Sequence, residues 1–100
     1  MAEFGNPFSG LASERYLTHT ELIRAIRFMV AAEYEAIQLY TQLAESTTNK
    51  LAQAVLRDIA NEEKVHAGEF LRLLKQLDPD EESYYNQGAE EVEEMIREIV

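Results

Sequence analysis

The sequence contains no cysteine among its 100 residues. Disulfides and thiolate metal sites are therefore excluded, and any metal site must use oxygen and nitrogen ligands. Glycine and proline are scarce, with four and two residues, while 46% of the chain is hydrophobic, which is typical of one small ordered domain. No basic segment leads into an apolar run at the N-terminus, and no apolar stretch is long enough to span a bilayer. We therefore expect a soluble protein of the cytoplasm.

Basic side chains are nearly absent from the C-terminal part of the chain. Residues 78–100 carry nine acids and one base, Arg97, whereas residues 1–77 carry ten acids and eight bases. Because nucleic acids and anionic membranes are bound mainly through Lys and Arg, the chain is not expected to bind either. Metal cations are the better charged partners, although solubility is the simpler explanation for the acidic tail taken alone.

Apolar residues recur at steps of three and four in two long segments, which predicts two helices. The first is expected over residues 19–45, after an irregular arm over residues 1–17, because Thr18 and Glu21 have the spacing of a capping box. The polar residues 46–49 supply a turn and an N-cap, and the second helix is expected to end near Leu77. Two long helices joined by a short turn pack as an antiparallel hairpin.

A third helical segment is expected over residues 78–100, with Asp78 as N-cap, Pro79 at the first helical position and a break near Gly88. Its second part has a narrow apolar seam that requires a partner surface, formed by Val92, Met95, Ile96 and Ile99. The predicted fold is all-α, with a hairpin over residues 18–77 and a short, acidic C-terminal helix. Since one hairpin has too little core to offset its ordering entropy, two copies are expected to form a four-helix bundle.

On each of the two predicted helices the recurring apolar residues form a stripe along one face. Three potential metal ligands occupy positions where these apolar stripes should continue. Glu33 lies on the first helix, and Glu63 and His66 lie about 60° apart on the second. A buried carboxylate must be paired, protonated or metal-bound, yet Arg57 and Lys64 project to another face of the second helix. A Glu from one helix and Glu-x-x-His from another make half of the ligand set of di-iron carboxylate proteins. The sequence therefore predicts a metal site at this position.

The other half of the ligand set must come from a second chain, at a two-fold axis. Carboxylates with one imidazole per metal suit Fe(II) and Fe(III) and leave positions open for dioxygen, so the ligand types favour a redox site. Tyr40, two turns after Glu33, could contact a ligand, bind iron weakly or donate an electron, or be an ordinary core tyrosine. Glu35 and Glu62 point to other faces, where they could pass cations inward or be solvated. His19 is expected to have no role.

The segments AEYEAIQLY (residues 32–40) and NEEKVHAGEF (residues 61–70) resemble the encapsulated ferritins, which are half-size members of the ferritin-like superfamily. The resemblance covers roughly residues 18–77. It implies a di-iron ferroxidase centre shared by two chains, with Glu33 and His66 as terminal iron ligands, Glu63 as the bridging ligand and Tyr40 nearby.

The resemblance also implies that Glu35 matches a glutamate at a metal access site and that Glu62 is an acidic neighbour of the centre. The family oxidises Fe(II) with dioxygen, assembles as a ring of dimers, here expected to be a decamer, and delivers its product for iron storage and mineralisation inside an encapsulin nanocompartment. Some relatives have an acid in place of Ala32 and a tryptophan in place of Leu39. A targeting tail or a larger fused protein is expected beyond Val100.

Two other interpretations of the same residues stay open. The ligands could form a structural or peroxide-handling metal site, as in rubrerythrin-like proteins. Alternatively, the chain could be a metal-free helical interaction module, in which the polar residues fix the pairing register. Iron-dependent oxygen consumption distinguishes the ferroxidase from the first alternative, and metal bound between paired chains excludes the second.

Overall fold

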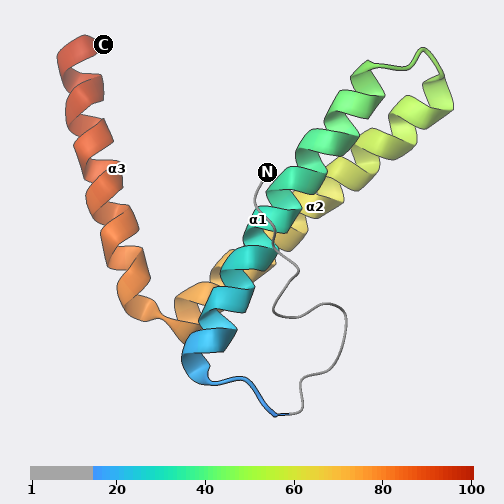
Figure 1. Ribbon diagram of the computed structural model, residues 1–100. Coiled ribbons are helices and arrows are strands. Elements are labelled where there is room, and N and C mark those ends of the chain that lie inside the picture. The colour runs from blue at the N-terminus through green and yellow to red at the C-terminus, as the bar shows by residue number, and fades with distance from the viewer. Residues whose placement is uncertain (1–14) are drawn as a thin grey trace.

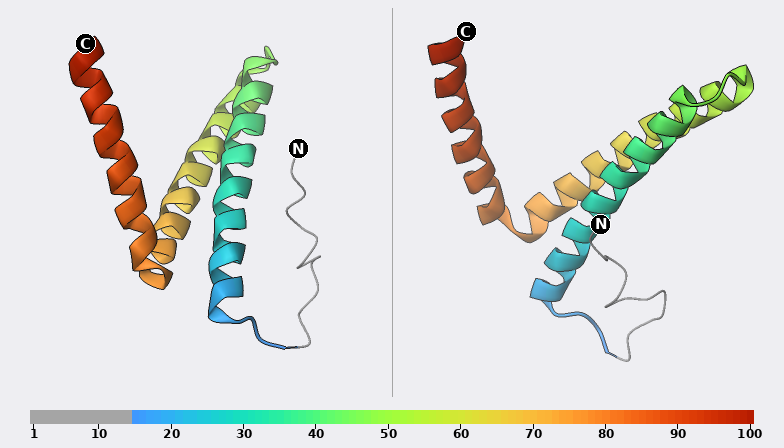
Figure 2. Two further views of the ribbon diagram at one scale, coloured as in Figure 1. Left: turned by 60° about the vertical axis from the view of Figure 1, so that its left-hand side comes forward. Right: turned by 45° about the horizontal axis from the view of Figure 1, so that its top comes forward.

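A computed structural model describes residues 15–100, which form three helices and no strand. Helices α1 (His19–Glu45) and α2 (Lys50–Leu77) lie side by side and antiparallel, as Figure 1 shows. Helix α3 (Pro79–Ile99) turns away from this hairpin, and the two further views in Figure 2 show the same separation. The all-α hairpin expected from the periodicity is confirmed. None of the helices in the described residues combines the length and apolar character of a bilayer-spanning segment.

The ends of the hairpin helices are fixed by the polar side chains that predicted them. The Thr18 hydroxyl accepts a hydrogen bond from the Glu21 N–H at 3.2 Å, and the Glu21 carboxylate accepts one from the Thr18 N–H at 2.9 Å, which completes the capping box. Asn49 caps α2 by accepting the Ala52 N–H at 2.9 Å. Residues 15–18 are not helical, and the rest of the expected N-terminal arm lies outside the described residues.

The hairpin core uses only part of each apolar stripe. The buried residues come from both helices and include three alanines, whose small side chains allow the helices to approach closely; they are Ile23, Ile26, Val30, Ala44, Ala60, Ala67 and Leu74. Other apolar side chains on the hairpin stay accessible, with 39% of Met29, 48% of Val55 and 75% of Leu51 exposed. Each stripe is therefore too wide to be covered by the other helix of the same chain.

Helix α3 is longer than expected. The predicted break near Gly88 is wrong, because α3 continues through this residue as one helix of 21 residues. A single interior glycine costs only about 1 kcal/mol relative to alanine, and the alanine and glutamates that follow it favour the helix. Pro79 occupies the first turn as predicted, but the Asp78 side chain makes no capping hydrogen bond.

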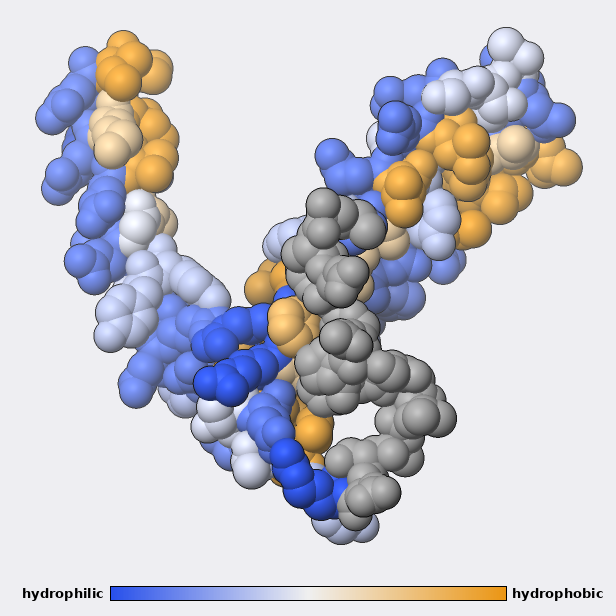
Figure 3. Space-filling view, in the orientation of Figure 1, coloured by the Kyte–Doolittle hydropathy of each residue, from blue (hydrophilic) through white to orange (hydrophobic). Residues whose placement is uncertain are grey.

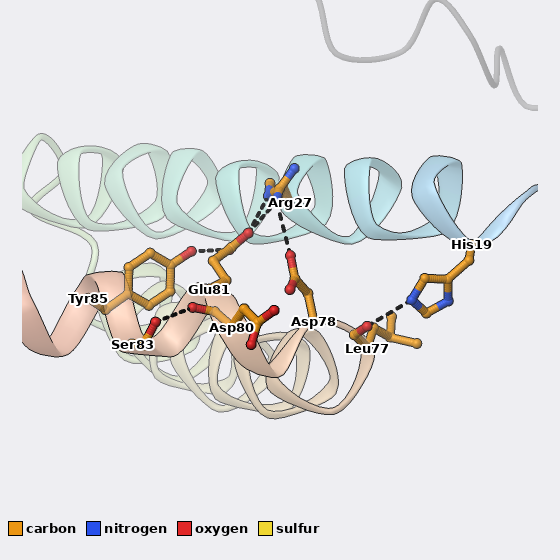
Figure 4. Close-up of polar contacts among 8 residues, drawn as sticks. All are labelled: His19, Arg27, Leu77, Asp78, Asp80, Glu81, Ser83 and Tyr85. Carbon is orange, nitrogen blue, oxygen red and sulfur yellow. Dashed lines mark hydrogen bonds and ion pairs between the residues drawn. The ribbon is translucent and has the colours of Figure 1, made fainter.

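Arg27 of α1 connects the hairpin to the start of α3, as Figure 4 shows. Its guanidinium donates two hydrogen bonds to Glu81 and lies 3.7 Å from the Asp78 carboxylate. Tyr85, one turn after Glu81, donates its hydroxyl to the same carboxylate. Arg27 lowers the pKa of Glu81, whereas the bond to Glu81 raises the pKa of Tyr85 to about 12.

Two further contacts link the elements at this end of the molecule. His19, at the start of α1, donates its Nε2–H to the Leu77 carbonyl at 2.8 Å (Figure 4), so the expectation that His19 has no role is wrong. This bond satisfies a backbone acceptor at the C-terminal end of α2, where helical carbonyls lack partners within the helix. Lys75 of α2 forms an ion pair with Glu82 of α3 at 3.1 Å. Separate polar contacts from α1 and α2 thus hold the base of the hairpin and the first turn of α3.

Candidate metal centre

Glu33 from the middle of α1 meets Glu63 and His66 from the middle of α2. One ligand atom from each of the three side chains can be chosen so that all lie within 4.8 Å of one another. The His66 Nδ1 atom lies 3.6 Å from Glu63 Oε2 and 3.9 Å from Glu33 Oε2. The structure therefore brings together the three residues that helical spacing singled out.

The two carboxylates of this cluster are largely removed from water. The side chains of Glu33 and Glu63 are 16% and 19% exposed, whereas that of His66 is 49% exposed. Glu33 Oε2 is buried and has no hydrogen-bond partner. A buried carboxylate oxygen without a partner costs free energy unless a proton or cation approaches it.

The electrostatics of the cluster also favour the approach of a proton or a cation to Glu33. The adjacent Glu63 carboxylate raises the pKa of Glu33, removal from water adds to the rise, and His66 opposes it. No Lys or Arg within residues 15–100 forms an ion pair with either glutamate. Arg57 and Lys64 are exposed, as their helical phase predicted. No Lys or Arg of the described part of the chain supplies positive charge to this carboxylate pair, and His66 supplies it only when protonated.

This donor set fits a transition-metal ion. Carboxylate oxygens and an imidazole nitrogen are common ligands of iron, and three ligands from one side leave coordination positions open. The half-exposed His66 places the open side of the cluster at the surface of the hairpin rather than inside it. A second chain, water or dioxygen could therefore reach a metal held by the three residues.

The other candidate residues lie outside the three-residue cluster. Tyr40 makes no hydrogen bond to Glu33, Glu63 or His66; it lines a groove of about 380 Å³ toward the tip of the hairpin, together with Leu39, Gln42, Leu43 and Ser46. Glu35 is half-buried and Glu62 is exposed, and neither belongs to the cluster. Their roles in metal access stay predictions. Sequence reasoning missed the Arg27 network and the His19 bond, whose partners are more than 50 residues away along the chain.

Comparison with protein families gives one match to most of the chain. The model described as rubrerythrin matches residues 21–99, which include every candidate ligand. The ferritin-like-encapsulin shell fusion protein of Pyrococcus furiosus is 41% identical over 78 residues, covering 78% of this chain and 23% of the fusion protein. The encapsulin nanocompartment cargo protein EncC of Myxococcus xanthus is 39% identical over 85 residues, covering 85% of this chain and 65% of EncC. The chain thus spans less than two thirds of the length of either relative.

A solved structure is similar over nearly the whole fold. The crystal structure of the encapsulated ferritin domain from Pyrococcus furiosus has a TM-score of 0.81 and 37% sequence identity to this chain. The similarity covers 87% of this chain and 89% of that domain. The three-helix arrangement, with α3 turned away from the hairpin, is therefore found in an experimental structure of a relative.

Proposed function

Because the chain belongs to the rubrerythrin family and to its encapsulated ferritins, we propose that it is a ferroxidase, which oxidises Fe(II) to Fe(III) with dioxygen. The observation that carries this proposal is the cluster of Glu33, Glu63 and His66, whose buried Glu33 oxygen has no partner in the described chain. Two carboxylates and an imidazole within 4.8 Å of one another can hold one cation and share a second.

A di-iron site of this type needs the ligands of two chains. Di-iron carboxylate bundles use a Glu from each of two helices and a Glu-x-x-His pair from each of two more, and one chain supplies half of that set. The cluster opens at the surface, and by helical phase the accessible Met29 and Val55 lie on the same faces of α1 and α2 as Glu33 and His66. Pairing two hairpins on this face would bury those side chains and place two half-sites together. The proposed enzyme is therefore active as a homodimer or a larger assembly of dimers.

Each residue has a separate proposed role. When bound, the iron ions supply the electrons that reduce dioxygen. Glu33 and His66 would be terminal iron ligands, and Glu63 would be the bridging ligand. Tyr40, two turns beyond Glu33 on α1, would assist the centre, and Glu35 and Glu62 would attract cations toward it. The anionic ligands favour Fe(III) over Fe(II), because they compensate the additional positive charge.

We further propose that the chain works inside an encapsulin shell in the cytoplasm. One relative is named as an encapsulin cargo protein, and another joins a ferritin-like segment to an encapsulin shell in one chain. A ring of dimers, as a decamer, is the assembly proposed for this setting. The shell would hold the mineral product, since a helical hairpin with an open face encloses no storage volume of its own.

Oxygen consumption on addition of Fe(II) tests the proposed activity. Glu63→Gln and His66→Ala should each lower the initial rate at least about 100-fold, because each removes a metal ligand. Glu69→Gln is the matched control, since Glu69 is an exposed carboxylate on α2 outside the cluster. It should keep the wild-type rate.

The same assay separates the alternatives. A structural metal site would bind iron without consuming oxygen, and a rubrerythrin-like site would consume hydrogen peroxide with Fe(II) faster than dioxygen. Equal rates for Glu63→Gln, His66→Ala and the Glu69→Gln control would contradict the proposed centre.

A further inference from the structure

One face of α3 is turned toward the hairpin of the same chain, and its outer end is apolar. Near the base of α3, Glu81 on this face accepts hydrogen bonds from Arg27 of α1. Val92 and Ile96 follow Glu81 and Tyr85 by 11 residues, which is three helical turns, so they lie on the same face. Figure 3 shows the hydrophobic side of the outer half of α3 directed toward the hairpin. The α3 seam consists of Val92, Met95, Ile96 and Ile99, and between 45% and 82% of each residue is exposed.

The direction of α3 is held only by contacts at the surface. Helix α3 has no buried residue. Asp78 alone separates the end of α2 at Leu77 from the start of α3 at Pro79, and its side chain makes no capping hydrogen bond. Ion pairs at the surface contribute about 1 kcal/mol or less each, and segments without buried contacts change their arrangement at low cost. A change in the direction of α3 would therefore leave the hairpin core intact.

The ion pair between Lys75 and Glu82 gives a register in which α3 can lie along α2. Lys75 Nζ is 3.1 Å from Glu82 Oε2. Lys64 lies 11 residues before Lys75 on α2, and Glu93 lies 11 residues after Glu82 on α3, so both steps are three turns. If the helices were antiparallel neighbours, Lys64 and Glu93 would face each other as the first pair does. Both are exposed, and neither forms an ion pair with any residue from 15 to 100.

Small residues lie between the two ends of this register. Gly68 and Ala89 are each seven residues from the Lys75–Glu82 pair, so they would face each other in the same arrangement. Likewise Gly88, seven residues after Glu81, would face Tyr34, which lies seven residues after Arg27 and is 52% exposed. A methyl group added at Gly68 or at Gly88 would meet no atom within 4 Å, so both places are open. The helices could thus approach closely along this line.

The charges of the two surfaces are also complementary. Helix α3 has eight acids and one base, Arg97. The bases of α2 fall within an arc of about 80° that includes Lys75 and Lys64, and its acids lie on other sides of the helix. The side of α2 that would receive α3 is therefore basic, which favours an acidic helix there.

We propose that α3 is a hinged arm that closes onto the hairpin of its own chain, with Glu93 against Lys64 and the α3 seam against the side that carries Tyr34. The structure shows the open position of the arm (Figures 1 and 2). Closure requires Leu77 and Pro79 to leave their helices, and the resulting connection of three residues is long enough to join antiparallel helices. The closed arm removes the α3 seam from water in the unpaired chain, and opening exposes the seam again.

The arm closes on a side of the hairpin that does not carry the metal cluster. By helical phase, Glu63 and His66 lie about 100° and 160° from Lys64 around α2. Closure therefore leaves the cluster open, and it does not depend on the proposed iron chemistry.

An engineered disulfide tests the closed position, because the sequence contains no cysteine of its own. Gly68→Cys with Ala89→Cys should form a disulfide within one chain, since disulfides require Cα atoms within about 7 Å. Gly68→Cys with Glu90→Cys is the matched control, because Glu90 follows Ala89 but points about 100° away. In the metal-free full chain, at concentrations where sedimentation shows monomers, the first pair should oxidise at least about tenfold faster. Non-reducing electrophoresis separates disulfides within a chain from those between chains, and circular dichroism checks that each variant stays helical.

Charge reversal in the Gly68→Cys, Ala89→Cys chain tests the register. Adding Lys64→Glu should slow oxidation about threefold, as expected for the loss of an exposed ion pair, and adding Glu93→Lys as well should restore the rate. Replacing Glu93→Lys with Glu94→Lys keeps the net charge and should leave oxidation slow.

Three results would overturn the proposal. The Ala89 and Glu90 cysteine pairs could oxidise at equal rates, or Glu94→Lys could restore the rate as well as Glu93→Lys does. Disulfides formed only between chains would assign the α3 seam to a second copy instead of the hairpin of its own chain.

Discussion

The glutamates of this chain differ in whether a positively charged side chain lies beside the carboxylate. Arg15 lowers the pKa of Glu21 to about 2, and Arg27 lowers that of Glu81. Glu33 has the opposite surroundings, because the neighbour with the largest effect on it is a second carboxylate, Glu63, which raises its pKa. Two glutamates are thus paired with arginine, whereas the largely buried Glu33 lies beside another acid, which favours a cation at that place.

Glu33→Gln should stabilise the metal-free protein while removing metal binding. The substitution keeps the shape of the side chain and removes a charge that is mostly buried and repelled by Glu63. A gain on the order of 1 kcal/mol in the free energy of unfolding corresponds to a rise in Tm of about 4 °C for a chain of this size. Thermal unfolding with and without Fe(II) measures both effects. A lower Tm in the metal-free variant would show that the Glu33 charge is satisfied within the chain.

Tyr85 should titrate near pH 12 as long as Glu81 accepts its hydroxyl. A raised pKa means that the contribution of this bond to the stability of the junction is complete below about pH 10 and is lost as the pH rises through about 12. Glu81→Gln should therefore return the pKa of Tyr85 toward about 10. The ultraviolet absorbance of tyrosinate measures the change, with Glu82→Gln as the neighbouring control. An unchanged titration would show that Glu81 does not hold the hydroxyl.

At the scale of the helices, the sequence alone predicts the structure wherever side chains close together along the chain determine it. The capping box at Thr18, the Asn49 cap and Pro79 mark three helix starts, and the structure confirms each. Helical phase also predicted that Glu63 and His66 share one face of α2, because spacing along a helix determines which side chains share a face. Glu33 was predicted on the facing side of α1, and the structure brings the three residues together.

The remaining features depend on contacts that local sequence does not encode. Gly88 signals a break, yet its cost is small compared with the propensity of the surrounding residues, so α3 stays continuous. The bonds from Arg27 to Glu81 and from His19 to Leu77 depend on the direction in which α3 leaves the hairpin. That direction is set by the contacts at the junction between the hairpin and α3, and it cannot be predicted from the spacing of apolar residues along the chain.

Arg27→Ala should loosen α3 without unfolding the hairpin. The substitution removes the hydrogen bonds to Glu81 and the approach to Asp78, while the buried residues of α1 and α2 are untouched. Because the pair lies at the surface, the loss of stability should stay below about 1 kcal/mol. Amide exchange in the first two turns of α3 should nevertheless become several-fold faster. Arg24→Ala, on an exposed position of α1, is the control, and equal exchange in both variants would contradict the role of Arg27.

At the scale of the whole molecule, one copy leaves two surfaces uncovered. The hairpin exposes apolar side chains such as Met29 and Val55, and α3 exposes Val92, Met95, Ile96 and Ile99. Pairing of two hairpins on the first surface would complete the proposed di-iron centre.

Activity should follow the fraction of paired chains on dilution. At constant total iron, oxygen consumption per chain should fall as the protein concentration passes below the dissociation constant of the dimer, because a single chain holds only half of the ligands. Dimers fixed by chemical cross-linking should keep their rate over the same range. A constant rate per chain, in solutions shown by sedimentation to contain monomers, would contradict a site shared by two chains.

Anomalous scattering from iron-loaded crystals tests the shared centre most directly. The account predicts two iron peaks between a pair of chains, surrounded by Glu33, Glu63 and His66 of both chains. The absence of iron at these residues, or an iron ion whose protein ligands all come from one chain, would contradict it.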